Sequence, residues 1–215
     1  MPGGFPFAEA KPKSGDWAKH SMMMGSTTQT AVEIEFGGTS YVGTESVVAI
    51  TGMPSIPGMP SIPNMPSIPG MNAEPTASLI LSEKGKPAGK SWVVTKTGAQ
   101  VQCTKVGVPG QPTPPQGNSE PVIRPDMTLI GTDTYKVPET GQTIKVWKYR
   151  MKVTTQGQTF EQEMWISNEV PMYSVKMAAD NPTAPGTMTT VMELLAFGSG
   201  GKVSITAAEL AANCK

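Results

Sequence analysis

His20 is the residue best suited to acid–base or metal chemistry, because it is the only histidine of the chain. It lies between Lys19 and Ser21 in a segment with the composition of a strand. A catalytic imidazole needs a nucleophile or a carboxylate within hydrogen-bond reach, and the sequence identifies neither. We therefore expect His20 to be an exposed strand residue.

No catalytic motif accompanies this histidine. The sequence contains no GxSxG, no phosphate-binding glycine loop before a helix and no HExxH. Asp126 and Asp133 fall in one strand region, and isolated carboxylates in such regions are usually surface residues. We therefore predict that the protein is not an enzyme and that it uses no cofactor.

The 15 methionines raise the question of copper, because thioethers are soft ligands for Cu(I). Methionines 53, 59, 65 and 71 recur every six residues in a proline-rich segment, which spaces them about 19 Å apart in polyproline II. Met22, Met23 and Met24 are adjacent, but strand alternation sends Met23 to the opposite face. On this basis we expect no metal site.

The two cysteines, Cys103 and Cys214, are too few to form a metal site by themselves. They are either two free thiols or, if the protein is exported, one disulfide that ties the C-terminal segment to the sheet. The loop closed by such a bond would be long, and its chain-entropy contribution would reach about 4–5 kcal/mol. The sequence leaves both alternatives open.

Composition and charge exclude several functions. Of the 215 residues, 38% are hydrophobic and 16% are charged, with 17 basic residues against 17 acidic ones. A chain without net charge has no long-range field to attract nucleic acid, so we expect no nucleic-acid partner. No stretch approaches the roughly 20 apolar residues of a membrane-spanning helix. The first residues, Met1 to Phe7, lack the basic start and apolar stretch of a signal peptide.

Most of the chain has the β-branched, alternating composition of antiparallel strands. Val32, Ile34 and Phe36, for example, alternate with Glu33 and Glu35, as in a sheet with one wet face. Gly25-Ser26-Thr27 has the composition of a turn. The expected strands are 17–24, 29–36, 41–51, 76–82, 91–96, 100–106, 127–137, 170–177 and 188–197, together with a hairpin over 143–166.

Residues 53–71 interrupt this pattern with three copies of the hexapeptide MPSIPx. Their prolines exclude a helix or a central strand, and polyproline II has a period of three that fits the repeat. One edge of such a helix would then be apolar. This edge would either pack on the sheet of its own domain or contact a partner, another subunit or a lipid surface. The third alternative is that the segment is a disordered linker. The predicted interaction edge consists of Met53, Ile56, Met59, Ile62, Met65, Ile68 and Met71.

The hairpin over 143–166 is specified by its side-chain pairs. With Gln156-Gly157 as the turn, Arg150 faces Glu163 and Lys152 faces Glu161 on one side of the sheet. The other side collects apolar residues that either line a cavity or belong to a packed core. The predicted ligand-binding residues are Trp147, Tyr149, Met151, Phe160 and Met164.

A short C-terminal helix is indicated by two coincident signals. Thr206 and Glu209 form a capping box, and Ile205 and Leu210 form the matching hydrophobic staple. The predicted fold is therefore mainly β, a curled antiparallel sheet with this helix. The domain organisation is an extended segment 1–13 and one domain 14–215, which carries an insertion at 52–72 and a proline-rich loop at 107–125.

Five segments resemble a family of uncharacterised bacterial exported proteins related to the LolA/LppX-like lipoprotein carriers. They are Gly15-Asp16-Trp17, LIGTDTYKVP at 129–138, MWISNEVP at 164–171, Val175-Lys176-Met177 and MELLAFG at 192–198. The resemblance implies a β half-barrel around an apolar cavity, located in the periplasm or at the cell surface. The chain departs from the family pattern at Glu139-Thr140-Gly141-Gln142 and in the MPSIPx insertion.

Two functions follow from these observations. The first is a non-catalytic extracytoplasmic protein that carries a hydrophobic ligand such as a lipid or a lipoprotein. The second is a structural or assembly protein of the cell exterior, for which residues 53–71 supply the contact. An apolar cavity of a few hundred Å³ would favour the first function, and oligomerisation that requires residues 53–71 would favour the second.

Overall fold

The computed structural model describes residues 12–23, 25–50, 75–86, 91–106, 127–155, 158–180 and 187–215. Most of the predicted N-terminal segment 1–13 lies outside these residues, as do the whole insertion 52–72, the proline-rich loop 107–125 and the Gln156-Gly157 turn. The predictions for the interaction edge at 53–71 therefore stay predictions.

In the described part of the chain, 11 antiparallel strands form one sheet that does not close. Their order across the sheet is β6-β5-β4-β3-β2-β1-β11-β10-β9-β8-β7. The predicted fold class, mainly β with a short C-terminal helix, is confirmed. The elements are β1 (Trp17–Met22), β2 (Gly25–Phe36), β3 (Thr39–Ile50), β4 (Thr76–Glu83), β5 (Ser91–Thr97), β6 (Gln100–Val106), β7 (Met127–Lys136), β8 (Thr143–Thr155), β9 (Gln158–Ile166), β10 (Ser174–Asp180), β11 (Met188–Gly198) and α1 (Ala207–Asn213).

Two predicted boundaries are wrong. The segment Gly25-Ser26-Thr27 is not a turn but the start of β2, because β1 and β2 pair from Trp17 to Met22 and the chain reverses after Met22. The other error is at β10, which begins at Ser174 rather than at residue 170. Residues 168–173 form turns there, and Pro171 favours this because it cannot donate a sheet hydrogen bond.

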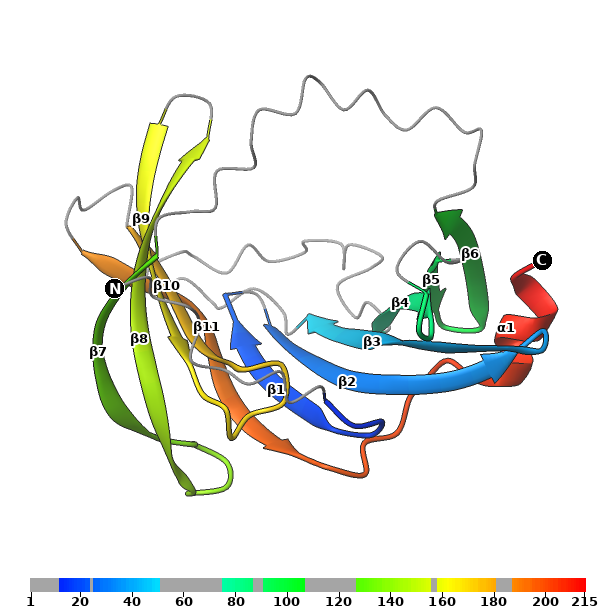
Figure 1. Ribbon diagram of the computed structural model, residues 1–215, viewed down its shortest axis with the longest axis horizontal. Helices are drawn as coiled ribbons and strands as arrows, with labels where there is room; N and C mark the ends of the chain where they lie inside the picture. Colours follow the sequence, from blue (N-terminus) through cyan, green and yellow to red (C-terminus); the bar gives the residue numbers. More distant parts are fainter. Residues whose placement is uncertain are drawn as a thin grey trace, which may run out of the picture.

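The sheet is strongly curled. Tyr135 on β7 donates its hydroxyl hydrogen to the carbonyl oxygen of Leu194 on β11, at 2.7 Å, although three strands separate β7 from β11 in the sheet order. In a flat sheet these strands would lie about 19 Å apart. At the other end α1 contacts both β2 and β6, which are also separated by three strands. Figure 1 shows the bend between the upright strands β7–β9 and the crossing strands β2 and β3.

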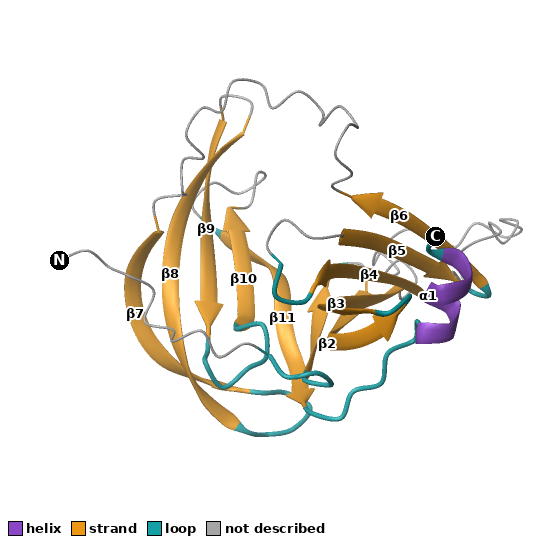
Figure 2. Ribbon diagram, turned by 45° about the vertical axis from the view of Figure 1, so that its right-hand side comes forward, coloured by secondary structure: helices purple, strands orange, loops and turns teal. Residues whose placement is uncertain are grey.

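We call the face that α1 covers the inner face and the opposite one the outer face. Strand alternation places Tyr135 of β7 on the inner face, together with the residues that pack against α1. One inner cluster joins α1 to β2–β6 and includes Leu79, Leu81, Trp92 and Val94. A second cluster lies where β7 and β8 curl toward β11, and Figure 2 shows these two parts of the sheet side by side.

Three kinds of contact attach the C-terminal segment to the inner face. The buried carboxylate of Glu45 accepts hydrogen bonds from the backbone N–H groups of Ser204 and Ile205, at 2.9–3.0 Å, and from the Ser204 hydroxyl. Lys96 forms an ion pair with Glu209 at 2.7 Å. The predicted capping box of Thr206 and Glu209 is present at the start of α1.

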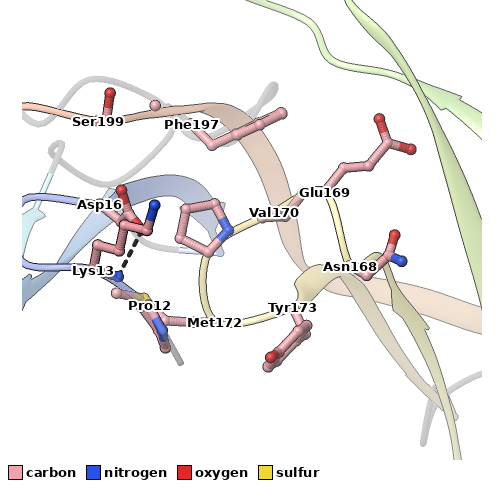
Figure 3. A pocket seen from close by; sticks show the side chains of 12 residues that line it. Pro12, Lys13, Asp16, Asn168, Glu169, Val170, Met172, Tyr173, Phe197 and Ser199 are labelled. Atoms are coloured by element: carbon pink, nitrogen blue, oxygen red, sulfur yellow. Dashed lines mark hydrogen bonds between the residues drawn. The ribbon is translucent and has the colours of Figure 1, made fainter. Parts of the chain in front are cut away.

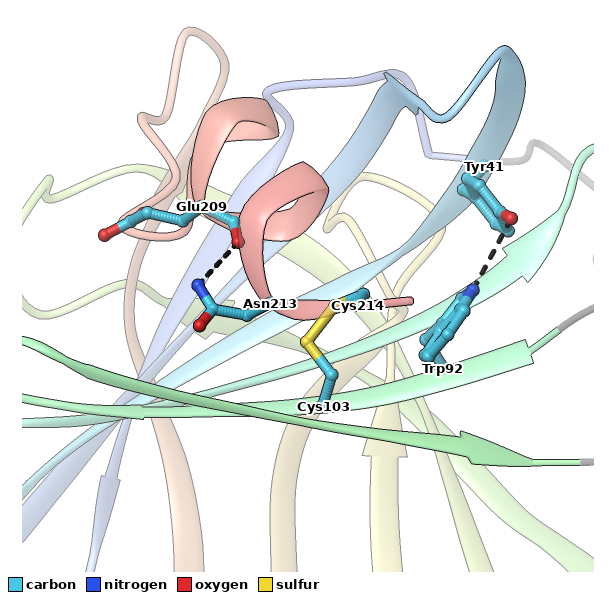
Figure 4. Close-up of a disulfide and its surroundings, with 6 residues drawn as sticks. All are labelled: Tyr41, Trp92, Cys103, Glu209, Asn213 and Cys214. Atoms are coloured by element: carbon cyan, nitrogen blue, oxygen red, sulfur yellow. Dashed lines mark hydrogen bonds between the residues drawn. A yellow bond between two sulfur atoms is a disulfide. The ribbon is translucent and has the colours of Figure 1, made fainter.

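A disulfide joins Cys103 on β6 to Cys214 just after α1 (Figure 4). Of the two alternatives left open by the sequence, the structure shows the bridged one. The bond closes a loop with a sequence separation of 111 residues. It therefore ties the C-terminus to the strand at one edge of the sheet. Figure 4 also shows the side chains of Tyr41 and Trp92 near this disulfide.

Candidate functional site: a methionine-lined groove

A row of large side chains crosses the outer face from one strand to the next. Met22 on β1 is the Cα partner of Met192 on β11, which in turn is the partner of Met177 on β10. Directly opposed residues of antiparallel strands point to the same face. The complete row, from β7 to β3, is Leu129, Tyr149, Met164, Met177, Met192, Met22, Gly25 and Ile50.

Part of this row is hollowed into a groove of about 470 Å³. The volume falls in the range of roughly 300–1,000 Å³ that is typical of small-molecule sites. The groove lies at the reversal between β1 and β2, next to the end of β3 and the facing parts of β10 and β11. It is lined by Met22, Met23, Gly25, Ser26, Val48, Ile50, Met177, Val191 and Met192.

Gly25 contributes to the groove by its missing side chain. It lies between Met22 and Ile50 in the row and leaves a gap there. A Cβ added at this position would lie 2.1 Å from the carbonyl oxygen of Ala49, so a larger residue would displace the backbone of β3. The close approach of β2 and β3 therefore requires glycine and leaves the space above it open.

The groove belongs to a larger apolar surface. The outer face also carries most of the large hydrophobic side chains that the described strands expose, whereas such side chains usually face a core. Ile80 is 59% exposed and Ile50 is 53% exposed. The exposed apolar side chains on this face are Met22, Val42, Val48, Ile50, Ile80, Val106, Leu129 and Phe160.

His20 is next to this groove and is fully buried, so the expected exposure is wrong. Its Nε2 atom lies 2.9 Å from the carbonyl oxygen of Ser174, which places the imidazole between β1 and β10. Its Nδ1 atom is buried and has no hydrogen-bond partner among the described residues. Burial lowers the pKa of the imidazole, which favours the neutral form of the ring.

The five predicted ligand-binding residues lie on the outer face, in or beside the same row. Met164 is the Cα partner of both Met177 and Tyr149, and Met151 is the partner of Met127. Tyr149 is buried, which raises the pKa of its hydroxyl, whereas Phe160 is 37% exposed. None of the five is among the described residues that line the groove. Their role in ligand binding therefore stays a prediction.

Four residues of the groove were not predicted from the sequence: Met177, Met192, Val48 and Ile50. Each lies in a segment that was correctly predicted as a strand, but no local pattern shows which distant strands are neighbours. The pairing of β1 with β11 joins residues about 170 positions apart in sequence. The only available signal was the compact run Met22, Met23 and Met24.

A second pocket, of about 370 Å³, lies where residues 12–16, the turns at 168–173 and the end of β11 meet (Figure 3). Met172 and Tyr173 there have φ values of 63° and 62°. This left-handed conformation costs roughly 1–3 kcal/mol for a residue other than glycine. Backbone hydrogen bonds hold it, from Tyr173 N–H to the Val170 carbonyl at 3.0 Å and from Ser167 N–H to the Tyr173 carbonyl at 2.9 Å.

The carboxylates of this second pocket already have backbone partners. Asp16 accepts a hydrogen bond from the Lys13 N–H at 2.8 Å, and Glu169 accepts one from the Lys145 N–H at 2.9 Å. Both carboxylates therefore stabilise the backbone around this pocket. The methionine-lined groove is therefore the stronger candidate site.

Two further properties bear on the site. Among the described residues, no group of three or more His, Cys, Asp or Glu side chains is arranged to hold a metal ion. The part of the chain that the structure describes also contains no helix with the length and apolar character needed to cross a membrane.

Comparisons with known proteins give limited similarity. No family model matches the sequence, and no curated protein matches it. A crystal structure of a candidate lipoprotein from Parabacteroides distasonis matches with a TM-score of 0.42 at 9% identity, covering 87% of this chain and 97% of that one. A candidate exported protein with a YmcC-like fold from Bacteroides fragilis matches with a TM-score of 0.38 at 10% identity, covering 88% of this chain and 98% of that one.

Neither description names a LolA-like or LppX-like carrier, so the comparisons do not support the more specific resemblance drawn from the sequence. Both similar structures are described as exported or lipoprotein-type proteins. Scores this low assign neither a family nor a function to the chain.

Proposed function

We propose that the protein is a non-catalytic binding protein that holds an apolar ligand, such as one acyl chain of a lipid or lipoprotein, in the methionine-lined groove. The observation that carries this proposal is the groove itself. Its lining combines Met, Val and Ile side chains with Gly25 and Ser26, and its described residues include no titratable side chain. Such a lining favours an alkyl chain over a charged or strongly polar molecule.

The flexibility of methionine supports this function. Four methionines line the groove, and each has an unbranched side chain with three rotatable bonds. A surface of this kind adapts to chains of different length or unsaturation at low conformational cost. The groove is therefore suited to a class of apolar ligands rather than to one rigid molecule.

We also place the protein outside the cytoplasm, in the periplasm or at the cell surface. The bond between Cys103 and Cys214 supports this location, because disulfides persist in oxidising compartments and are rare in the cytosol. An extracytoplasmic protein that binds acyl chains is a candidate carrier between membranes, as the resemblance noted in the sequence implies.

A matched pair of substitutions on β3 tests the groove. Val48 lines it and is 39% exposed, whereas Val42 lies on the same face of the same strand, outside the lining, and is 37% exposed. We expect the wild type to bind the fluorescent fatty acid cis-parinaric acid. Val48→Asp should lose this binding, because the ligand would have to desolvate a carboxylate. Val42→Asp should retain it.

Equal binding by both variants would contradict the groove as the site. Loss of binding in both variants would point to a diffuse apolar surface instead. Circular dichroism of each variant shows whether the two substitutions disturb the fold equally.

A structural or assembly role is the second candidate, and the extent of the outer apolar face favours it. Ile80 and Val106 are exposed on this face but lie beyond the groove. In this role a protein partner or a second copy of the chain covers them, and the edge predicted at 53–71 supplies the contact. Light scattering of the full-length chain and of a variant lacking residues 53–71 tests this role, which predicts oligomers that the deletion abolishes.

A further inference from the structure

The three methionines Met22, Met192 and Met177 are consecutive partners across β1, β11 and β10. Side chains in such positions start from Cβ atoms roughly 4.5–5.5 Å apart. Because a methionine side chain has three rotatable bonds, the outer two sulfurs can turn toward the middle one. All three side chains line the same groove, so the register brings three thioethers within reach of a single point above Met192.

His20 adds a nitrogen with a defined proton position. Its Nε2 atom lies 2.9 Å from the carbonyl oxygen of Ser174, and a carbonyl can only accept a hydrogen bond. Nε2 therefore carries the proton, and Nδ1 of the neutral ring carries a free lone pair. This Nδ1 atom is buried without a hydrogen-bond partner among the described residues, an arrangement that usually costs free energy.

The arrangement of His20 is the usual one for a metal-binding histidine. Such a histidine donates its second ring N–H to a backbone carbonyl or a carboxylate, which fixes the tautomer and the ring orientation. His20 also lies on the same face as the thioethers, two residues before Met22, and its cross-strand partner Leu194 is two residues after Met192. His20 is not among the described residues that line the groove, and it is the strand register that places it beside Met22 and Met192.

We propose that the groove binds Cu(I) through the thioether sulfurs of Met22, Met177 and Met192, with Nδ1 of His20 as the nitrogen ligand. These ligands are soft and neutral, which suits a soft monovalent ion. A divalent ion such as Zn²⁺ would keep its full double charge in an apolar setting, at a much greater desolvation cost. The inference goes beyond the proposed function, because it uses the lone pairs of sulfur rather than the apolar surface of methionine.

Leucine substitutions test whether the sulfur atoms bind the ion. Met22→Leu, Met177→Leu and Met192→Leu remove the sulfur but keep an apolar side chain of similar volume. Met151→Leu is the matched control, because Met151 lies on the same face but outside the groove lining. We would titrate each full-length protein with Cu(I) under anaerobic conditions, in competition with the chromophoric chelator bicinchoninate.

Each of the three substitutions should weaken Cu(I) binding at least about tenfold, since changes in outer-shell partners of a metal site already cost roughly 10–100-fold. Met151→Leu should leave the affinity for Cu(I) unchanged, because Met151 does not line the groove. Affinity for Cu(I) that is unchanged in the three variants would overturn the proposal. Loss of Cu(I) binding in Met151→Leu to the same degree would overturn it as well.

A second measurement locates the ion without relying on the variants. In protein with ¹³C-labelled methionine methyl groups, Ag(I) serves as a redox-inert substitute for Cu(I). Resonances of Met22, Met177 and Met192 should shift together at one equivalent of Ag(I), while that of Met151 stays in place. Shifts confined to the methionines at 53, 59, 65 and 71 would contradict the site.

Discussion

At the scale of single residues, the buried carboxylate of Glu45 is the most consequential polar group on the inner face. It is 1% exposed and accepts hydrogen bonds from two backbone N–H groups and one hydroxyl of the C-terminal segment. Hydrogen bonds to a charged acceptor are worth about 1.5–3 kcal/mol, and their loss leaves buried donors without a partner. Glu45 therefore determines how the segment leading to α1 attaches to the sheet.

Glu45→Gln should lower the free energy of unfolding by about 3 kcal/mol, because an amide cannot accept all of these hydrogen bonds. Glu33→Gln is the matched control, since the Glu33 carboxylate forms an exposed ion pair with Lys84 and should contribute less than about 1 kcal/mol. Urea unfolding of both variants measures the difference. Equal losses would show that Glu45 does not hold the segment.

The pH dependence of the unfolding free energy should show the stabilising contribution of the ionised Glu209 carboxylate. Its hydrogen bonds with Lys96 and with the backbone of Thr206 lower its pKa from 4.5 to about 2. Because the folded-state pKa lies below the unfolded one, its stabilisation is complete above pH 4.5 and is lost as the pH falls toward 2. The stabilisation that Glu209 contributes is modest, because its side chain is partly exposed to solvent.

The measurement is the difference in unfolding free energy between the wild type and Glu209→Gln at several pH values. This difference should be constant near neutral pH and should shrink between pH 4.5 and about 2. A difference that does not change with pH would contradict the assigned role of the carboxylate.

At the scale of elements, the sequence predicts most reliably what is local. The capping box at Thr206 and the register that pairs Arg150 with Glu163 are both confirmed, because the first joins residues three positions apart and the second joins residues 13 positions apart within one hairpin. The start of β2 was predicted incorrectly. Gly25 permits the close approach of two strands, and the sequence does not distinguish such a glycine from one in a turn. The burial of His20 depends on Ser174, which is 154 residues away in sequence.

Reduction of the Cys103–Cys214 bond should destabilise the domain and release α1 first. A loop of this length corresponds to about 4–5 kcal/mol of chain entropy in the unfolded state. Hydrogen exchange over Ala207–Asn213 should accelerate strongly after reduction, while exchange in β9 and β10 should change little. Uniform acceleration across the sheet would show that the bond supports the whole domain rather than the attachment of the helix.

At the scale of the whole molecule, the curled sheet separates two surfaces with different roles. The inner face carries the cluster packed against α1 and the attachment of that helix, and the outer face carries the groove and the exposed apolar side chains. The antiparallel sheet and the helix follow from sequence periodicity. The groove does not, because it forms where β1, β10 and β11 become neighbours, and that pairing cannot be derived from any one segment.

Photo-crosslinking with a palmitate that carries a diazirine near the end of its chain would locate the bound acyl chain on the protein. After irradiation and proteolysis, we expect the label on peptides that contain Met22–Ser26, Val48–Ile50, Met177 or Met192, with competition by unlabelled palmitate. A label restricted to β8 and β9 around Trp147 and Phe160, or one that unlabelled palmitate does not displace, would contradict the groove as the binding site.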